Sequence, residues 1–242
     1  MKTSVQGMIE EGSLVIQDNL KQYPYLIRLL TETDLMAVMN LQSKVLDGLK
    51  RQELCVPIPA EELRQMLENR GEIIGLFIHE KLYAVCAMLL TVDYEKNMAR
   101  ELNFTAEQLS QVAQFELSLV DSELQGLKLQ QRLAAILAQR VEKRKQARYL
   151  FTTVSPYNYA SIQTVTSLGL QITKLTKMYY GWDRYIVYKD FGNPVKLDLA
   201  NPVIVANTSF EEQHQLLNDG YRGFSQYQDQ EGSKIVFAKP FE

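Results

Sequence analysis

The sequence has very few of the residues that build metal centres and nucleophilic catalytic sites. Its 242 residues include only two histidines, His79 and His214, and two cysteines, Cys55 and Cys86. Neither histidine has a second ligand at zinc-site spacing, so no metal site is expected. A serine or cysteine nucleophile also needs a positioned histidine, and neither has that context. The cysteines lack a CxxC spacing and lie in apolar surroundings, which predicts reduced core thiols.

Charge and hydropathy exclude further classes. The 29 acidic and 26 basic residues give a net charge of −3, so no nucleic-acid partner is predicted. The basic run Arg140–Arg148 is interpreted as the solvated C-terminal end of a helix. No segment approaches a membrane span, and the opening MKTSVQGMIEEGS has no apolar signal-type stretch. We therefore expect a cytoplasmic protein with no membrane partner. The nucleotide-binding pattern GxxxxGK[ST] is absent, which disfavours an NTPase.

A strand–turn–helix unit stands out in what the chain does contain. Residues 116–133 read ELSLVDSELQGLKLQQRL: an apolar run, a polar break with Gly126, and then a helical pattern. The inward positions of this helix share helical spacing; they are Leu129, Leu133, Ile136, Leu137 and Val141. An exposed helix N-terminus presents unpaired N–H groups and the positive end of the helix dipole. The unit therefore predicts a place for a pyrophosphate.

A second such unit follows at Thr152–Leu170, TTVSPYNYASIQTVTSLGL. A short strand runs into Pro156, Asn158 takes a helix-capping position, and Gly169 ends the helix. The other predicted elements are a strand and helix, a hairpin and a terminal hairpin, at Tyr25–Leu49, Glu72–Thr91 and Met178–Lys189. Residues before Pro24 are polar and weakly patterned, and Leu14–Ile16 are expected either to form a short strand or to pack as a tail.

This order of pieces resembles the GNAT (N-acetyltransferase) superfamily over roughly Tyr25–Phe191, and it is most similar to uncharacterised GNAT-like proteins with a C-terminal extension. The resemblance implies an α/β fold with a mixed, centrally splayed β-sheet flanked by helices. It also implies acetyl-CoA as co-substrate, without a metal, and transfer of its acyl group to an amine.

In the resembled superfamily the phosphate loop reads Arg/Gln-x-x-Gly-x-Gly/Ala, and its backbone amides surround the pyrophosphate. The matching positions here, with one residue beyond them, are Gln125, Gly126, Leu127, Lys128, Leu129, Gln130 and Gln131. Gln125 fits the pattern, whereas Lys128 and Gln130 stand where glycines are expected. Glycine lets a phosphate approach the backbone without a Cβ in the way. Lys128 therefore either swings outward and adds a point charge or obstructs a degenerate site.

The same resemblance implies that the pantetheine arm pairs with the backbone of Leu117–Val120, where Leu119 and Val120 contact it. The strand across the splay would be Phe151–Val154. Asn158 matches the asparagine that anchors the arm in the superfamily. The other interpretation of Asn158 is a helix N-cap, and one side chain can serve both purposes.

The catalytic proton has few candidate groups. Many relatives carry a tyrosine seven residues after the matching asparagine, where this chain has Val165. Glu116, in an apolar strand beside the expected thioester, is the candidate general base, because desolvation raises the pKa of a carboxyl group. The other interpretation of Glu116 is a solvated edge carboxylate paired with Arg or Lys. A water relay to bulk solvent, which needs no dedicated residue, is the other route for the proton. The acceptor pocket is expected from the loops Val45–Glu62 and Asp93–Ser110.

Beyond Phe191 the composition changes at Gly192–Pro194. A strand, a helix from Phe210 and a hairpin around Asp229–Gly232 are predicted there. We therefore expect a GNAT-like acyl-CoA-binding domain at 1–191 and a small β-α-β-β (α+β) appendage at 192–242. So short a segment needs a partner surface, either on the main domain or on a second subunit of a homodimer.

The sequence thus favours an acetyl-CoA-dependent N-acyltransferase that acts on a small-molecule or peptide amine. Two alternatives stay open: a non-catalytic acyl-CoA-binding or regulatory module with a degenerate site, and a scaffold whose cofactor groove is closed.

Overall fold

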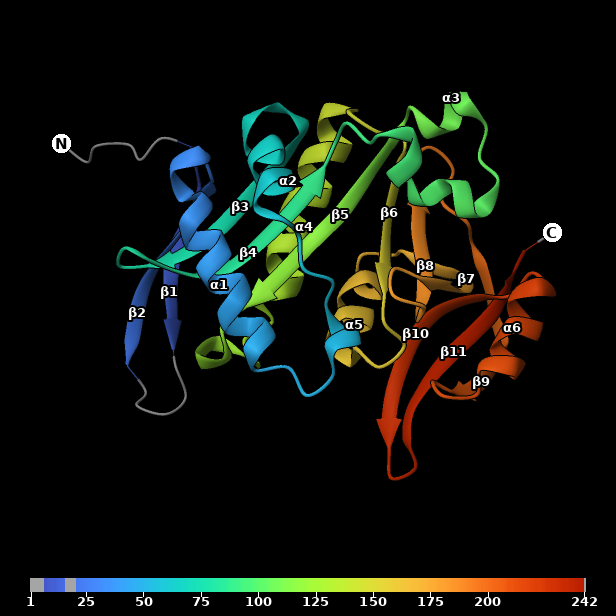
Figure 1. The fold of residues 1–242 in the computed structure, drawn as a ribbon. Coiled ribbons are helices and arrows are strands. Elements are labelled where there is room, and N and C mark those ends of the chain that lie inside the picture. Colours follow the sequence, from blue (N-terminus) through green and yellow to red (C-terminus); the bar gives the residue numbers. More distant parts are fainter. Residues whose placement is uncertain (1–6, 16–20, 242) are drawn as a thin grey trace. The chain divides into compact units, whose positions relative to one another are not determined.

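The computed structural model describes residues 7–15 and 21–241, and these form two compact units (Figure 1). Unit 1 combines the described residues up to Gln52 with Val56–Thr91 and Phe115–Arg140. Unit 2 combines Glu53–Cys55 and Val92–Gln114 with the chain from Val141 onward. The strand β5, Val112–Val120, begins in unit 2 and ends in unit 1.

Unit 1 is built on a mainly antiparallel sheet with the strand order β1-β2-β3-β4-β5. The first four strands pair antiparallel in sequence order, and they are β1 (Met8–Val15), β2 (Gln22–Leu29), β3 (Gly71–Ile78) and β4 (Lys81–Leu89). The two central strands are apolar on both faces, and all residues from Ile73 to Ile78 are buried. Such continuous burial requires helices on both sides of the sheet.

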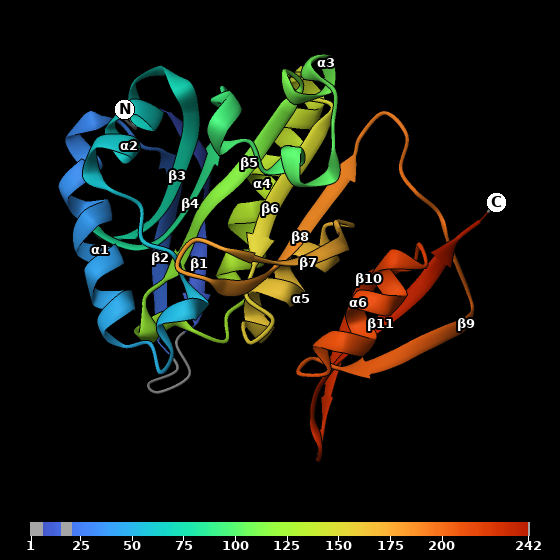
Figure 2. The ribbon, with the colours of Figure 1, turned by 45° about the vertical axis from the view of Figure 1, so that its right-hand side comes forward.

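The helices of unit 1 supply that cover. They are η1 (Glu32–Asp34), α1 (Leu35–Asp47), α2 (Ala60–Gln65), its π-helical continuation η3 (Met66–Arg70), and α4 (Leu129–Arg144), which ends in unit 2. In both views α1 and α2 lie on one face of these strands and α4 lies on the other (Figures 1 and 2). Leu129, Leu133 and Leu137 of α4 are buried, as the helical spacing predicts.

Unit 2 has the strand order β5-β6-β8-β7-β10-β11-β9. The start of β5 pairs in parallel with β6 (Tyr149–Val154) through Val112–Gln114, and the other pairs are antiparallel. The remaining strands are β7 (Gln171–Met178), β8 (Trp182–Asp190), β9 (Leu197–Ala206), β10 (Arg222–Asp229) and β11 (Gly232–Pro240). The helical segments are η2 (Gln52–Leu54), η4 (Tyr94–Lys96), η5 (Met98–Leu102), α3 (Ala106–Leu109), η6 (Ser122–Leu124, in unit 1), α5 (Tyr159–Ser167) and α6 (Phe210–Asn218).

The C-terminal elements are attached to the rest of unit 2 through buried contacts. Gly223 of β10 lies opposite Ile172 of β7, and a Cβ at Gly223 would come within 3.0 Å of the Ile172 side chain, so glycine permits this approach. The buried Tyr185 hydroxyl of β8 donates to Gln213 of α6 at 2.6 Å. Gln213 donates in turn to the carbonyl of Ala206 at 2.7 Å. The elements expected after Phe191 thus occur in the expected order (Figure 2). The boundary at 191 stays a prediction.

Two boundaries differ from the sequence prediction. Strand β1, Met8–Val15, includes Leu14 and Val15 of the short strand considered at Leu14–Ile16 but begins earlier, and Ile16 lies outside the described residues. The strand is mostly exposed, so no alternation marks its start. The hairpin expected at Met178–Lys189 has its turn at Tyr179–Gly181, because the first strand, β7, already ends at Met178. Both cysteines are free thiols, Cys86 buried and Cys55 partly buried. Within residues 7–15 and 21–241, no helix is long and apolar enough to span a bilayer, and no group of His, Cys, Asp or Glu has metal-binding geometry.

Candidate functional site

The predicted phosphate loop lies in unit 1 between η6 and α4. Gly126 has a φ of +82°, and a Cβ there would meet nothing within 4 Å. Two residues later Lys128 has a φ of +55° and an exposed side chain, and α4 begins at Leu129. The left-handed region is where glycine is favoured, and a side chain there costs roughly 1–2 kcal/mol. Lys128 therefore keeps the backbone conformation that a glycine at this position permits.

The amides of this loop and of the first turn of α4 lack backbone acceptors. Across the part of the chain that the structure describes, no acceptor lies within hydrogen-bonding distance of five N–H groups, those of Gly126, Leu127, Lys128, Leu129 and Gln131. The carbonyl of Lys128 accepts from the amide of Arg132 at 3.1 Å and thus starts the helix. Unpaired amides at the N-terminus of a 16-residue helix favour an anion.

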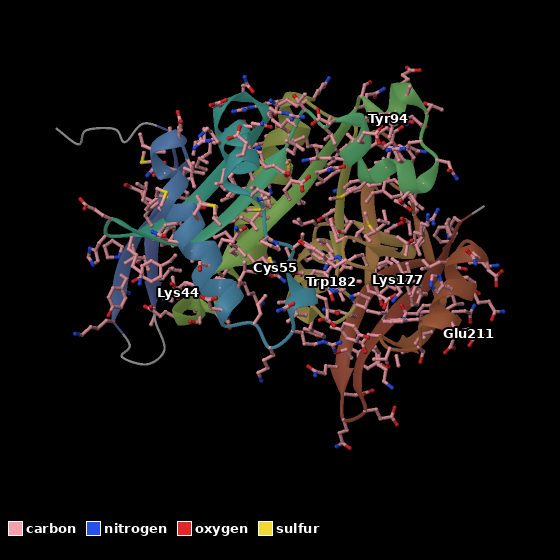
Figure 3. All side chains as sticks on the ribbon, viewed as in Figure 1. Lys44, Cys55, Tyr94, Lys177, Trp182 and Glu211 are labelled. Atoms are coloured by element: carbon pink, nitrogen blue, oxygen red, sulfur yellow. The ribbon has the colours of Figure 1, made fainter. Side chains whose placement is uncertain are left out.

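A buried charged group anchors the entry to the loop. Asp121 follows β5 directly and is 1% exposed. Its carboxylate accepts from Lys44 of α1 at 2.7 Å and from the amide of Glu123 at 3.1 Å, and its own amide donates to the carbonyl of Tyr83 (Figure 3 labels Lys44). These contacts fix the chain just before Gln125, so α1, β4 and the loop are joined at one point.

The charges of this anchor stabilise one another. Burial raises the pKa of Asp121, but the hydrogen bonds from Lys44 and from the Glu123 amide outweigh burial, so its pKa lies below the usual value. Hydrogen bonds to Asp121 and Glu123 raise the pKa of Lys44. This pair leaves no pattern in the sequence, because its members are 77 residues apart. The only local signal is a carboxylate directly after a strand, with Glu123 two residues later.

The predicted residues of β5 alternate in burial. Leu117 and Leu119 are buried, whereas Glu116 and Val120 are partly exposed. The predicted general base and Val120 therefore lie on the less buried face of the strand, and Leu119 points its side chain into the core of unit 1. A pantetheine contact of Leu119 and Val120 would involve their backbone groups.

Asn158 lies in unit 2 and caps α5. Its side-chain oxygen accepts from the amide of Ser161 at 3.0 Å, and its amide nitrogen donates to the carbonyl of Leu54 at 3.0 Å. The N-cap interpretation is thus confirmed, and the same side chain also holds the segment Glu53–Cys55. Val165 is buried in α5 and offers no proton.

Comparisons with known proteins agree with this geometry at the level of the fold. No family model matches the sequence, and no curated protein matches it either. Among solved structures, the ribosomal-protein-S18-alanine N-acetyltransferase of Escherichia coli is 20% identical with a TM-score of 0.51, covering 73% of this chain and 97% of that chain.

Two further solved structures give the same result. A GNAT-family acetyltransferase from Streptococcus pneumoniae is 15% identical with a TM-score of 0.54, covering 69% of this chain and 98% of that chain. An acetyltransferase candidate from Salmonella typhimurium, solved with its cofactor acetyl-CoA, is 15% identical with a TM-score of 0.52, covering 73% of this chain and 99% of that chain. The chain therefore has the fold of the GNAT acetyltransferases, as the sequence predicted.

Proposed function

We propose that this chain is an acetyl-CoA-dependent N-acyltransferase that acts on an amine of a small molecule or a peptide. The observation that carries the proposal is the loop before α4, where unpaired amides and two left-handed residues, Gly126 and Lys128, precede a long helix. The shared fold supports the reaction class, because one neighbour was solved with acetyl-CoA.

The residues of the loop fit a diphosphate. The amides of Gly126, Leu127, Lys128, Leu129 and Gln131 would donate to it, and the exposed Lys128 ammonium would add a point charge. Gln125 directly precedes these donors, and Gln130 lies between Leu129 and Gln131. An exposed Lys128 supports the outward arrangement over an obstructed, degenerate site. Acetyl-CoA, when bound, supplies the thioester carbonyl that an amine attacks.

In this proposal Glu116 is the general base that removes a proton from the acceptor amine. An amine is protonated at neutral pH, and only its neutral form is a nucleophile. Glu116 accepts the proton at a carboxylate oxygen, from a position on the partly exposed face of β5. Val165 has no proton to donate, so general-acid catalysis does not come from that position.

The test combines binding with turnover. Calorimetry with acetyl-CoA should show saturable heat, and pantetheine, which lacks the diphosphate, should bind much more weakly. An amine library screened for free-thiol release, with product mass measured, should then yield an acylated amine. Binding without thiol release for any amine would instead favour a regulatory module. An absence of binding would contradict both cofactor-dependent functions and leave the scaffold.

A further inference from the structure

Among the described residues of unit 2, a buried arginine has no carboxylate partner. Arg184 of β8 is 5% exposed. Its Nη1 donates to the carbonyl of Glu53 at 2.8 Å, and its Nη2 approaches the carbonyl and the hydroxyl of Thr153 at 3.3 and 3.5 Å. Its Nε has no partner, and among the described residues no carboxylate lies within ion-pair distance of this side chain.

This arrangement is unusual for a charged group. Buried charges are nearly always paired with an opposite charge, because desolvation of an unpaired ion is costly. Burial lowers the pKa of Arg184, and the ionisable groups that act on its charge are the weak acids Tyr179 and Cys55. The neutral carbonyls around it satisfy donors but carry no full negative charge.

The unsatisfied donors share one edge of the guanidinium plane. Nη1 is held by a short bond to Glu53, while Nε is unpartnered and Nη2 makes only long contacts. Nε and Nη2 together form the side-on fork that binds the two oxygens of a carboxylate. The edge suited to a bidentate carboxylate is therefore the edge whose donors lack short hydrogen bonds within the protein.

An exposed tyrosine lies over this group. The Tyr179 ring centroid is 5.5 Å from Arg184 Cζ, and the Tyr179 hydroxyl is 3.0 Å from Thr153 Oγ1. Tyr179 has a φ of +56° and is 47% exposed. A bulky residue in the left-handed region is rare and often marks a functional turn. The partly exposed ring of Tyr179 is thus in cation–π range of the buried guanidinium, and its hydroxyl lies beside that of Thr153.

The two segments that hold Arg184 have predicted roles. Glu53 lies in the loop Val45–Glu62, expected to help build the acceptor pocket, and Thr153 lies in Phe151–Val154, expected to be the strand across the splay from the pantetheine arm. We propose that Arg184, with the hydroxyls of Thr153 and Tyr179, binds a carboxylate of the acyl acceptor. The acceptor is then an acidic amine, such as an amino acid or a peptide with a free carboxylate. This assignment rests on the proposed function.

Binding can be tested without turnover because the chain has a single tryptophan. Trp182 precedes Arg184 by two residues on β8, so the two side chains share a face of the strand (Figure 3 labels Trp182 and Cys55). Titration with succinate and glutarate should change Trp182 fluorescence saturably, while succinamide at matched ionic strength should not. This titration needs only the wild-type protein, so it is decisive even if a variant does not fold. An equal response to succinamide, or no saturable response, overturns the site.

Turnover tests the role of the site. Amino acids and their amides form matched acceptor pairs, and the wild type should prefer the acid in kcat/KM. A charge-assisted hydrogen bond corresponds to roughly 10- to 100-fold, so R184M should lose about that factor for the acid alone. R184K keeps the charge without the fork and should recover only part of it. Acetyl-CoA affinity, measured by calorimetry, should be unchanged in both variants.

The outcomes separate this inference from the proposed function. Turnover of amines with no preference for acids overturns the role of Arg184 and leaves the transferase intact. Saturable acid binding without thiol release from any amine overturns the acceptor role and the transferase together. An equal loss of kcat/KM for an acid and its amide in R184M would show a structural role instead.

Discussion

The loop before α4 in unit 1 and Arg184 in unit 2 both present unpaired donors, but they are built differently. The loop uses backbone amides and is exposed, so its donors depend on chain conformation and tolerate a lysine where a glycine is customary. The Arg184 group depends on one buried side chain held by two carbonyls. Substitutions of side chains in the loop before α4 should therefore weaken ligand binding only slightly. Substitution of Arg184 should remove most of the binding at its site.

The largest effect on turnover is expected at Glu116 of unit 1, because its proposed role is to accept a proton and not to bind acetyl-CoA. Glu116→Gln removes the proton acceptor, so kcat should fall by about 100-fold at neutral pH, within the usual range for general acid–base catalysis. Acetyl-CoA affinity should stay within about twofold. Steady-state kinetics and calorimetry check both values. Unchanged turnover would contradict the role of Glu116 as general base. Weaker acetyl-CoA binding would show that Glu116 helps to form the cofactor site.

The anchor at Asp121 should have the next largest effect. Asp121→Asn weakens the buried contact with Lys44, so the free energy of unfolding should fall by about 2–3 kcal/mol, and acetyl-CoA should bind more weakly because the loop loses its anchor. Chemical denaturation and calorimetry measure the two effects. Lys81→Met, at an exposed contact with Glu123, is the matched control and should change stability by about 0.5 kcal/mol or less.

This anchor also predicts a pH dependence. The pKa of Asp121 is lower in the folded state, so its stabilisation is present above the unfolded value of about 3.9 and is lost as the pH falls through the folded pKa. The difference in unfolding free energy between wild type and Asp121→Asn should therefore shrink below about pH 4. A constant difference from pH 7 to pH 3 would contradict this account of the anchor.

In unit 2, Tyr185→Phe should destabilise the fold by about 1–2 kcal/mol, because it leaves the buried Gln213 oxygen without its donor. Acetyl-CoA affinity should not change if the loop in unit 1 works independently. Thermal and chemical unfolding measure the stability. Tyr180→Phe at a 72% exposed position is the control. An equal loss in both variants would show that the buried bond contributes little.

The smallest effects are expected at Lys128. Lys128→Gly keeps the left-handed turn and relieves strain, so stability should rise by about 1 kcal/mol and acetyl-CoA affinity should fall by a few-fold at most. Lys128→Glu reverses the charge and should weaken binding by about 10-fold, with the effect reduced at high salt. Tighter binding in Lys128→Glu would mean that the lysine obstructs the loop.

Features that depend on local sequence could be predicted, whereas features that depend on contacts between distant residues could not. The inward face of α4 was predicted at Leu129, Leu133 and Leu137 because helical periodicity is local. The cap at Asn158 was predicted for the same reason. Contacts between distant residues leave no local pattern, so the pair Lys44–Asp121 was missed. Arg184 follows Asp183 at the polar start of β8, where nothing in the sequence distinguishes a buried arginine from an exposed one.

The proposed function depends on a diphosphate bound by the amides of Gly126–Leu129 and Gln131, and amide NMR of labelled protein tests this binding most directly. Saturating coenzyme A should shift the resonances of Gly126, Leu127 and Lys128 strongly, and pantetheine should leave them nearly unchanged. Resonances in this loop that stay fixed under saturating coenzyme A would contradict the claim.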